Sequence, residues 1–136
     1  MACPFFEPQV IVRLSGYPGA RLPLIEEYEG ACHAGSSVFE APGELRFQCC
    51  NHGYSRGKCP HFPQSETRSA VRFDVVSRST EFLELLCVEE QDHAPLRWLS
   101  LRYAIASGTL EPVLEDICAQ AQAQAFCRSF LRRFAC

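Results

Sequence analysis

Residues 49–63 read Cys-Cys-Asn-His-Gly-Tyr-Ser-Arg-Gly-Lys-Cys-Pro-His-Phe-Pro, and this stretch decides the fold that we expect for the chain. It holds three cysteines, two histidines, two glycines and two prolines within fifteen residues. A packed apolar core does not require so many thiol and imidazole groups, whereas a metal site does. We therefore predict that the chain is organised around a metal centre.

Two further cysteines, Cys3 and Cys32, precede this stretch. Cys3 and Cys59 are each followed by proline, and a Cys-Pro step also closes the cysteine run of bacterial ferredoxins, where thiolates hold iron. The predicted ligands of one centre are Cys3, Cys32, Cys50 and Cys59. Cys50 is chosen over Cys49 because it directly precedes the Asn-His-Gly-Tyr turn, which leaves Cys49 as a buried hydrophobe or a substitute ligand.

Three histidines follow these cysteines closely and could replace one thiolate in a zinc site with three cysteines and one histidine: His33, His52 and His61. General ligand preferences favour the alternative that they are loop histidines or donors to the sulfurs. The cysteine spacings match neither the Cys-x-x-Cys pairs of zinc ribbons nor a ferredoxin run, so the spacing leaves the metal open. The two Cys-Pro steps favour a 4Fe-4S cluster, with Zn²⁺ as the alternative.

The composition limits the other possibilities. A chain of 136 residues with 47% hydrophobic residues is long enough for one domain with its own core. The net charge of −3 gives no electrostatic reason to expect a nucleic-acid or membrane-surface partner. The N-terminus lacks the features of a signal peptide, and no apolar run reaches the roughly 20 residues of a membrane span, so we expect a cytoplasmic protein. Nine cysteines in such a chain indicate thiols and metal rather than disulfides.

The two halves of this single domain, 1–63 and 64–136, differ in character. Seven of the eight glycines and seven of the nine prolines lie in the first half, which predicts many loops. Two short helical turns are expected there, over residues 23–28 and 42–51. A metal would hold these loops together, because its binding energy becomes folding energy when the unfolded chain has no site.

In the second half, alternating apolar residues predict strands over 70–76, 82–89 and 96–105. A helix is predicted over 111–134 with Thr109 as its N-cap, and its apolar stripe is expected to cover the sheet, with a dimer seam as the alternative. The predicted class is therefore α+β. It comprises a loop-rich four-cysteine metal-binding cap packed on a small three-stranded antiparallel sheet with a long C-terminal helix.

Two features of the cysteine-rich stretch also match patterns found in enzymes. Residues 53–57 satisfy the Gly-x-Ser-x-Gly elbow of hydrolases, and Asp74, Asp92 and His93 follow in the required order. That motif needs a buried strand before the serine and a helix after it, whereas here a cysteine pair precedes and Cys-Pro follows, so we set it aside. A thiol redox enzyme using the pair at 49–50 would lack the Cys-x-x-Cys pattern of thioredoxin-like proteins.

The cysteine half resembles a group of uncharacterised bacterial proteins with a dispersed four-cysteine signature. The resemblance rests on Cys3-Pro4, on Gly30-Ala31-Cys32-His33, and on Cys50-Asn51 followed by Gly53-Tyr54, Arg56-Gly57 and Cys59-Pro60. It implies an iron–sulfur or zinc site and no substrate, and the doubled Cys49-Cys50 departs from it. We expect a metal-binding protein with an electron-transfer, redox-sensing or structural role rather than an enzyme. Its expected partner is another protein, or a second copy bound through the C-terminal helix.

Overall fold

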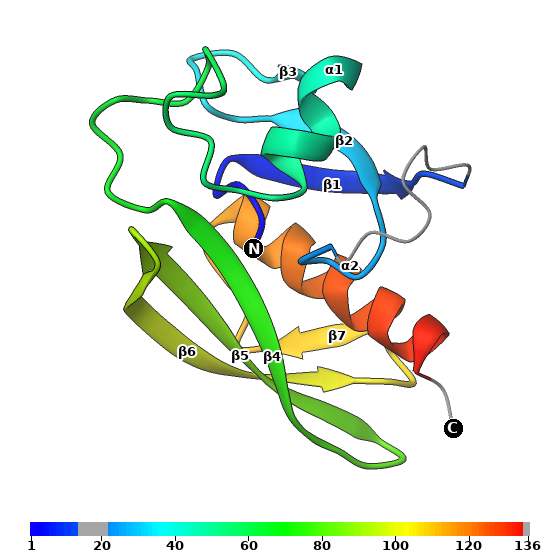
Figure 1. Ribbon diagram of the computed structural model, residues 1–136. Coiled ribbons are helices and arrows are strands. Elements are labelled where there is room, and N and C mark those ends of the chain that lie inside the picture. The colour runs from blue at the N-terminus through cyan, green and yellow to red at the C-terminus, as the bar shows by residue number, and fades with distance from the viewer. Residues whose placement is uncertain (14–21, 135–136) are drawn as a thin grey trace.

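The computed structural model describes residues 1–13 and 22–134, which form two antiparallel sheets with one long helix between them (Figure 1). The first half holds a three-stranded sheet in the order β1 (Phe6–Ile11), β2 (Tyr28–Cys32) and β3 (Phe39–Glu40). A short helical turn, α1 (Gly43–Leu45), continues directly into a π-helical turn, η1 (Arg46–Cys50). The predicted α+β class is confirmed, and this sheet in the first half is an element that the sequence pattern did not indicate.

The second half forms an antiparallel sheet in chain order. Its strands are β4 (Ala70–Arg78), β5 (Phe82–Gln91), β6 (Ala94–Ala104) and β7 (Thr109–Glu111). The prediction of three strands is wrong by one, because Thr109 begins a strand instead of capping a helix. Leu110 pairs with Tyr103 of β6 and is buried, which explains why this short stretch is a strand.

The C-terminal helix, α2 (Ile117–Arg133), begins six residues later than predicted. Asp116 is its N-cap, and the carboxylate of Asp116 accepts hydrogen bonds from the amide N–H groups of Cys118 and Ala119. An aspartate in this position satisfies two of the amides that a helix start leaves without partners. The cap therefore fixes the start of α2 beyond β7.

The helical turn predicted over residues 23–28 is wrong, because Tyr28 begins β2. Asn51 explains the difference: its side-chain carbonyl accepts a hydrogen bond from the Tyr28 N–H at 2.9 Å, and its amide group donates to the Tyr28 carbonyl at 3.0 Å. The buried Asn51 side chain thus takes the place of a neighbouring strand and holds Tyr28 extended. The turn predicted over residues 42–51 is confirmed as α1 and η1.

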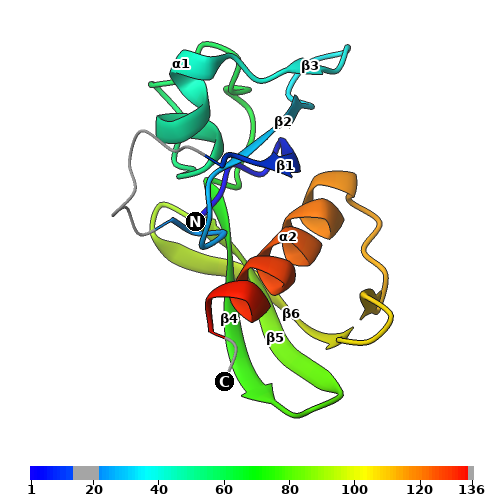
Figure 2. The ribbon, with the colours of Figure 1, turned by 90° about the vertical axis from the view of Figure 1, so that its right-hand side faces the viewer.

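Helix α2 packs between the two sheets (Figure 2). On one side, the ring of Phe126 lies against that of Phe73 on β4, with 5.5 Å between the ring centroids. On the other side, the amide group of Gln122 donates to the carbonyl oxygens of Cys3 and Phe6 at 2.7 and 2.8 Å. The helix therefore ties the start of the chain to the second half.

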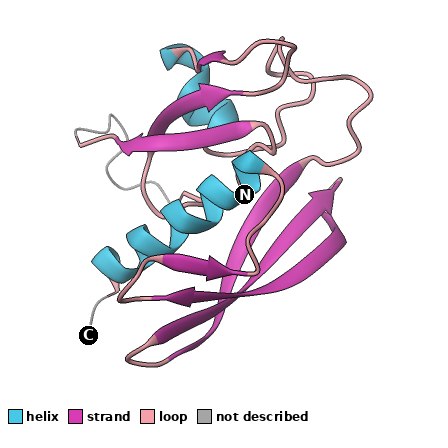
Figure 3. Ribbon diagram, turned by 180° about the vertical axis from the view of Figure 1, so that it is seen from behind, coloured by secondary structure: helices cyan, strands magenta, loops and turns pink. Residues whose placement is uncertain are grey.

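Residues 51–69, all of which the structure describes, contain no helix or strand and connect η1 to β4 (Figure 3). The chain start closes over the end of this connection, since Ala2 and Val71 exchange backbone hydrogen bonds of 2.6 and 2.8 Å. None of the helices within the described ranges has both the length and the apolar character needed to cross a membrane.

Replacing Asn51 with alanine should lower the free energy of unfolding by about 3 kcal/mol. The change leaves the Tyr28 N–H and carbonyl without their buried side-chain partner and removes one of the two hydrogen bonds to the Arg46 carbonyl. Chemical denaturation of Asn51→Ala and of the matched control Gln48→Ala, an exposed amide on the same π-turn, measures this. Equal losses in the two variants would show that Asn51 does not hold β2 in place.

Candidate metal centre

All four predicted ligands line one pocket, and the adjacent Cys49 lines it too, so five thiols face the same small space. The five are Cys3, Cys32, Cys49, Cys50 and Cys59. The other walls are mostly apolar and are formed by Phe5, Phe6, Ala34, Ser55, His61 and Phe62. Within the described residues no carboxylate lines this thiol pocket. A soft, carboxylate-free donor set of this kind suits zinc, copper(I) or iron–sulfur centres rather than magnesium or calcium.

Cys3 is positioned by its neighbours on both sides. Ala2 is fixed to β4, and the Cys3 N–H donates to the carbonyl oxygen of Cys50 at 3.1 Å. The Cys3 carbonyl accepts hydrogen bonds from the Phe6 N–H and from Gln122 of α2. These contacts bring Cys3, the first of the predicted ligands, to the π-turn that carries Cys49 and Cys50.

The π-turn explains how two consecutive cysteines reach one pocket. The Asn51 N–H donates to the carbonyl of Arg46, five residues earlier, at 2.9 Å. Such turns are rare and occur often at functional sites. The sequence predicts Cys50 alone as the ligand of this pair, because Cys50 directly precedes the Asn-His-Gly-Tyr turn. The structure places both Cys49 and Cys50 on the pocket.

Cys32 and Cys59 complete the pocket from β2 and from the long connection. Cys32 is the last residue of β2, where the sheet ends beside the π-turn. The Cys59 N–H donates to the carbonyl of Ser55 at 2.8 Å, closing a tight turn. Gly53, with φ of 71°, reverses the chain between the π-turn and this second turn, in a conformation that favours glycine.

Hydrogen-bond donors surround the sulfurs. The amide N–H of Phe5 donates to the Cys3 sulfur, and the amide N–H of Ala34 donates to the Cys32 sulfur. In both cases the donor is two residues beyond the cysteine. The Ser55 hydroxyl lies within hydrogen-bonding reach of the sulfurs of Cys3 and Cys49. Donors of this kind stabilise the negative charge of a ligating thiolate and tune the properties of a bound metal.

Burial keeps the thiols of Cys3 and Cys50 neutral at pH 7, because it raises their pKa values. Burial raises the pKa of Cys3 from 9.0 to about 12. The charge that the Cys32 and Cys59 sulfurs can carry contributes to this rise. Burial also raises the pKa of Cys50 far above its ordinary value, and the sulfur of Cys3 is the next largest cause. A metal must therefore displace protons as it binds. Redox enzymes activate a cysteine by lowering its pKa, so these shifts do not support a thiol redox enzyme.

Only one of the three candidate histidines lines the pocket. His61 does so, and its ring packs on Phe39 with 4.8 Å between the ring centroids. His33 is paired with Glu7 at 2.7 Å, and Nδ1 of His52 donates to the carbonyl oxygen of Phe47 at 2.6 Å.

The thiol pocket is small. The space that its side chains enclose is about 20 Å³, close to the room that one water molecule occupies. No three His, Cys, Asp or Glu side chains in residues 1–13 and 22–134 are arranged to hold a metal ion as they stand. The five thiols thus share a pocket without yet surrounding a common ion position, and binding of a centre requires their side chains to turn.

The remaining features of the cysteine-rich stretch have other roles. Ser55 is buried, and its hydroxyl donates to the Cys49 carbonyl at 3.1 Å. No strand precedes Ser55 and no helix follows it in the connection over residues 51–69, so the geometry of a hydrolase elbow is missing there. Cys87, Cys118 and Cys127 are buried but do not line the thiol pocket.

Comparisons of the whole chain with known proteins gave no match. No family model, no curated protein and no solved structure is significantly similar to it.

The stability of the metal-free protein should fall as the pH rises above 9. The pKa of Cys3 is about 12 in the folded chain against its ordinary value of 9.0, so the neutral thiol stabilises the fold below pH 9, and this contribution is lost between pH 9 and 12. Urea denaturation at a series of pH values should show a shallower fall for Cys3→Ala than for the unsubstituted protein. Parallel curves would contradict the burial of Cys3 in the thiol pocket.

Proposed function

We propose that this protein binds a 4Fe-4S cluster through the thiolates of Cys3, Cys32, Cys50 and Cys59. The observation that carries the proposal is that four cysteines spread over residues 3–59 line one pocket with apolar walls. An apolar core gains nothing from gathering five thiols, because other small apolar side chains fill the same volume without polar groups. A soft metal centre gives such a grouping a function.

The electrostatics of the pocket support a cationic occupant. Burial raises the pKa values of Cys3 and Cys50, and repulsion from the neighbouring sulfurs raises them further, so negative charge on these thiolates is costly. Iron or zinc ions neutralise that charge, and the amide groups of Phe5 and Ala34 assist them. When bound, the cluster would supply one-electron redox chemistry.

The exposure of the ligands suits electron transfer or redox sensing. Cys3 and Cys50 are buried, whereas Cys32 and Cys59 are partly exposed, so one edge of the centre would face the solvent. A partner could approach this edge closely. The first half of the chain would then act as a metal-binding cap, in which the centre holds the connection over residues 51–69 against β2 and the π-turn.

A structural zinc site is the second candidate, and the size of the pocket favours it. A space of about 20 Å³ accepts one ion with a small movement of the thiols, whereas an eight-atom cluster requires them to turn further apart. With zinc, the protein would be a redox-inactive module that presents a surface to another protein. His61 is the histidine that lines the pocket and could replace one thiolate in this version.

Metal analysis of oxygen-free material separates these functions. Purification and reconstitution under anaerobic conditions should give a brown protein with about four irons and about four sulfides per chain. A colourless protein with about one zinc per chain would favour the structural site. A protein that takes up neither metal would contradict both proposals.

Serine variants identify the ligands. Changing Cys3, Cys32, Cys50 or Cys59 singly to serine should reduce the retained iron several-fold, because serine oxygen is a much poorer ligand for these metals. Cys49→Ser should retain the metal if Cys50 is the third ligand. Cys87→Ser is the matched control, since Cys87 is buried outside the pocket and should retain full iron. Full iron retention in all four ligand variants would overturn the assignment.

A further inference from the structure

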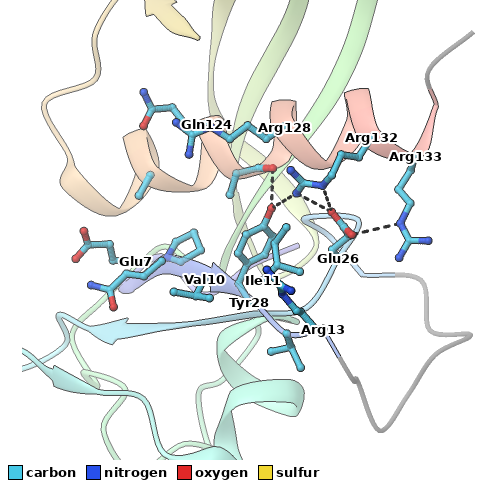
Figure 4. Close-up of a pocket in the computed structure, with 15 residues that line it drawn as sticks. Glu7, Val10, Ile11, Arg13, Glu26, Tyr28, Gln124, Arg128, Arg132 and Arg133 are labelled. Carbon is cyan, nitrogen blue, oxygen red and sulfur yellow. Dashed lines mark hydrogen bonds and ion pairs between the residues drawn. The ribbon is translucent and has the colours of Figure 1, made fainter.

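A second cavity runs between β1 and the face of α2 that looks away from the large sheet (Figure 4). Its volume is about 820 Å³, within the range of clefts that hold ligands. We call it the β1–α2 groove; it is lined by residues 7–13 of β1 and its extension, by Glu26 and Tyr28, and by side chains of α2 between Ala121 and Arg133. The thiol pocket takes Phe6 of β1, whereas the groove takes the residues of β1 that follow it.

The groove is positively charged. Four arginines line it: Arg13, Arg128, Arg132 and Arg133. The two lining carboxylates are already paired, since Glu26 lies 2.8 Å from Arg132 and 3.4 Å from Arg133, and Glu7 pairs with His33. Arg13 and Arg128 have no ion-pair partner among the described residues. Two uncompensated guanidinium groups in one groove stand out in a chain whose net charge is −3.

The groove is also bordered by a strand edge that pairs with no other strand in the described part of the chain, because β1 is at the edge of its sheet. The Val12 N–H donates to the carbonyl of Glu27, so the backbone N–H of Val12 points toward the strand that contains Tyr28. This hydrogen bond fixes which residues of β1 turn their backbone groups toward β2. Tyr28, the register partner of Ile11, turns its own N–H and carbonyl to Asn51. Two residues that lie opposite each other in an antiparallel pair of strands either exchange both N–H···O=C hydrogen bonds or both point their N–H and C=O groups away from the partner strand. Ile11, which lines the groove, therefore turns its N–H and carbonyl away from β2, toward the outer edge of the sheet.

We propose that the β1–α2 groove binds an extended acidic segment of a partner protein. The segment adds to the edge of β1 as a further strand, bonded to the backbone of Ile11, and its carboxylates pair with Arg13 and Arg128. The Val10 side chain, 60% exposed beside this edge, supplies an apolar contact. A small anion would use the guanidinium groups alone, whereas an extended chain uses the edge and the charges together.

Fluorescence anisotropy with a short labelled peptide of alternating Glu and Val tests the proposal on the full chain. The peptide should bind, and binding should weaken as salt is added. Arg128→Glu, an exposed substitution on α2, should weaken binding by about tenfold or more. Ile11→Pro removes the edge N–H at a position where an edge strand tolerates proline, and should weaken binding to a similar degree.

Matched controls separate this proposal from general charge effects and from the metal centre. Arg97→Gln, at an exposed arginine of β6, should leave binding unchanged, and a peptide of alternating Lys and Val should not bind. Absence of binding by the unsubstituted protein overturns the proposal, as does equal binding of the Lys peptide. Full binding by a folded Ile11→Pro variant overturns the added strand. Because iron content is measured separately, failure here leaves the proposed cluster untouched.

Discussion

The convergence of five thiols on one buried pocket is the constraint on which the rest of the structure depends. Thiolates so close together in an apolar setting repel one another, and burial already raises the pKa of Cys3 to about 12. Protons on Cys3 and Cys50 remove part of this repulsion. A metal centre resolves it by supplying positive charge, which makes the same pocket a strong binding site once the protons leave.

Distant parts of the chain build this pocket through polar contacts rather than through a continuous sheet. Asn51 joins β2 to the π-turn, and Gln122 reaches from α2 to the turn that begins at Cys3. The second half therefore acts as a scaffold for the first: α2 lies on the large sheet with one side and supports the cysteine-rich half with the other. The same helix, together with β1, forms the arginine-lined groove.

The sequence predicted features that depend on local pattern and missed those that depend on long-range polar contacts. Alternation over residues 70–105 identified three strands, and clustered cysteines identified the pocket, because both signals are periodic or compositional. Tyr28 of β2 is hydrogen-bonded to Asn51, 23 residues away, and no local propensity indicates such a contact. Leu110 becomes a strand residue only because Tyr103 lies beside it. Likewise, two adjacent cysteines share one pocket because of a π-turn. Its hydrogen bond joins residues five positions apart, and no residue type predicts such a turn.

X-ray absorption spectroscopy of the reconstituted protein at the iron edge tests the central claim most directly, because it reports which atoms bind the metal. If the protein binds a 4Fe-4S cluster, the atoms bound to iron should be sulfur, and each iron should have other irons close to it. Cys50→Ser should introduce an oxygen ligand or abolish the iron signal. Iron bound only by oxygen and nitrogen, with no sulfur ligand, would contradict it.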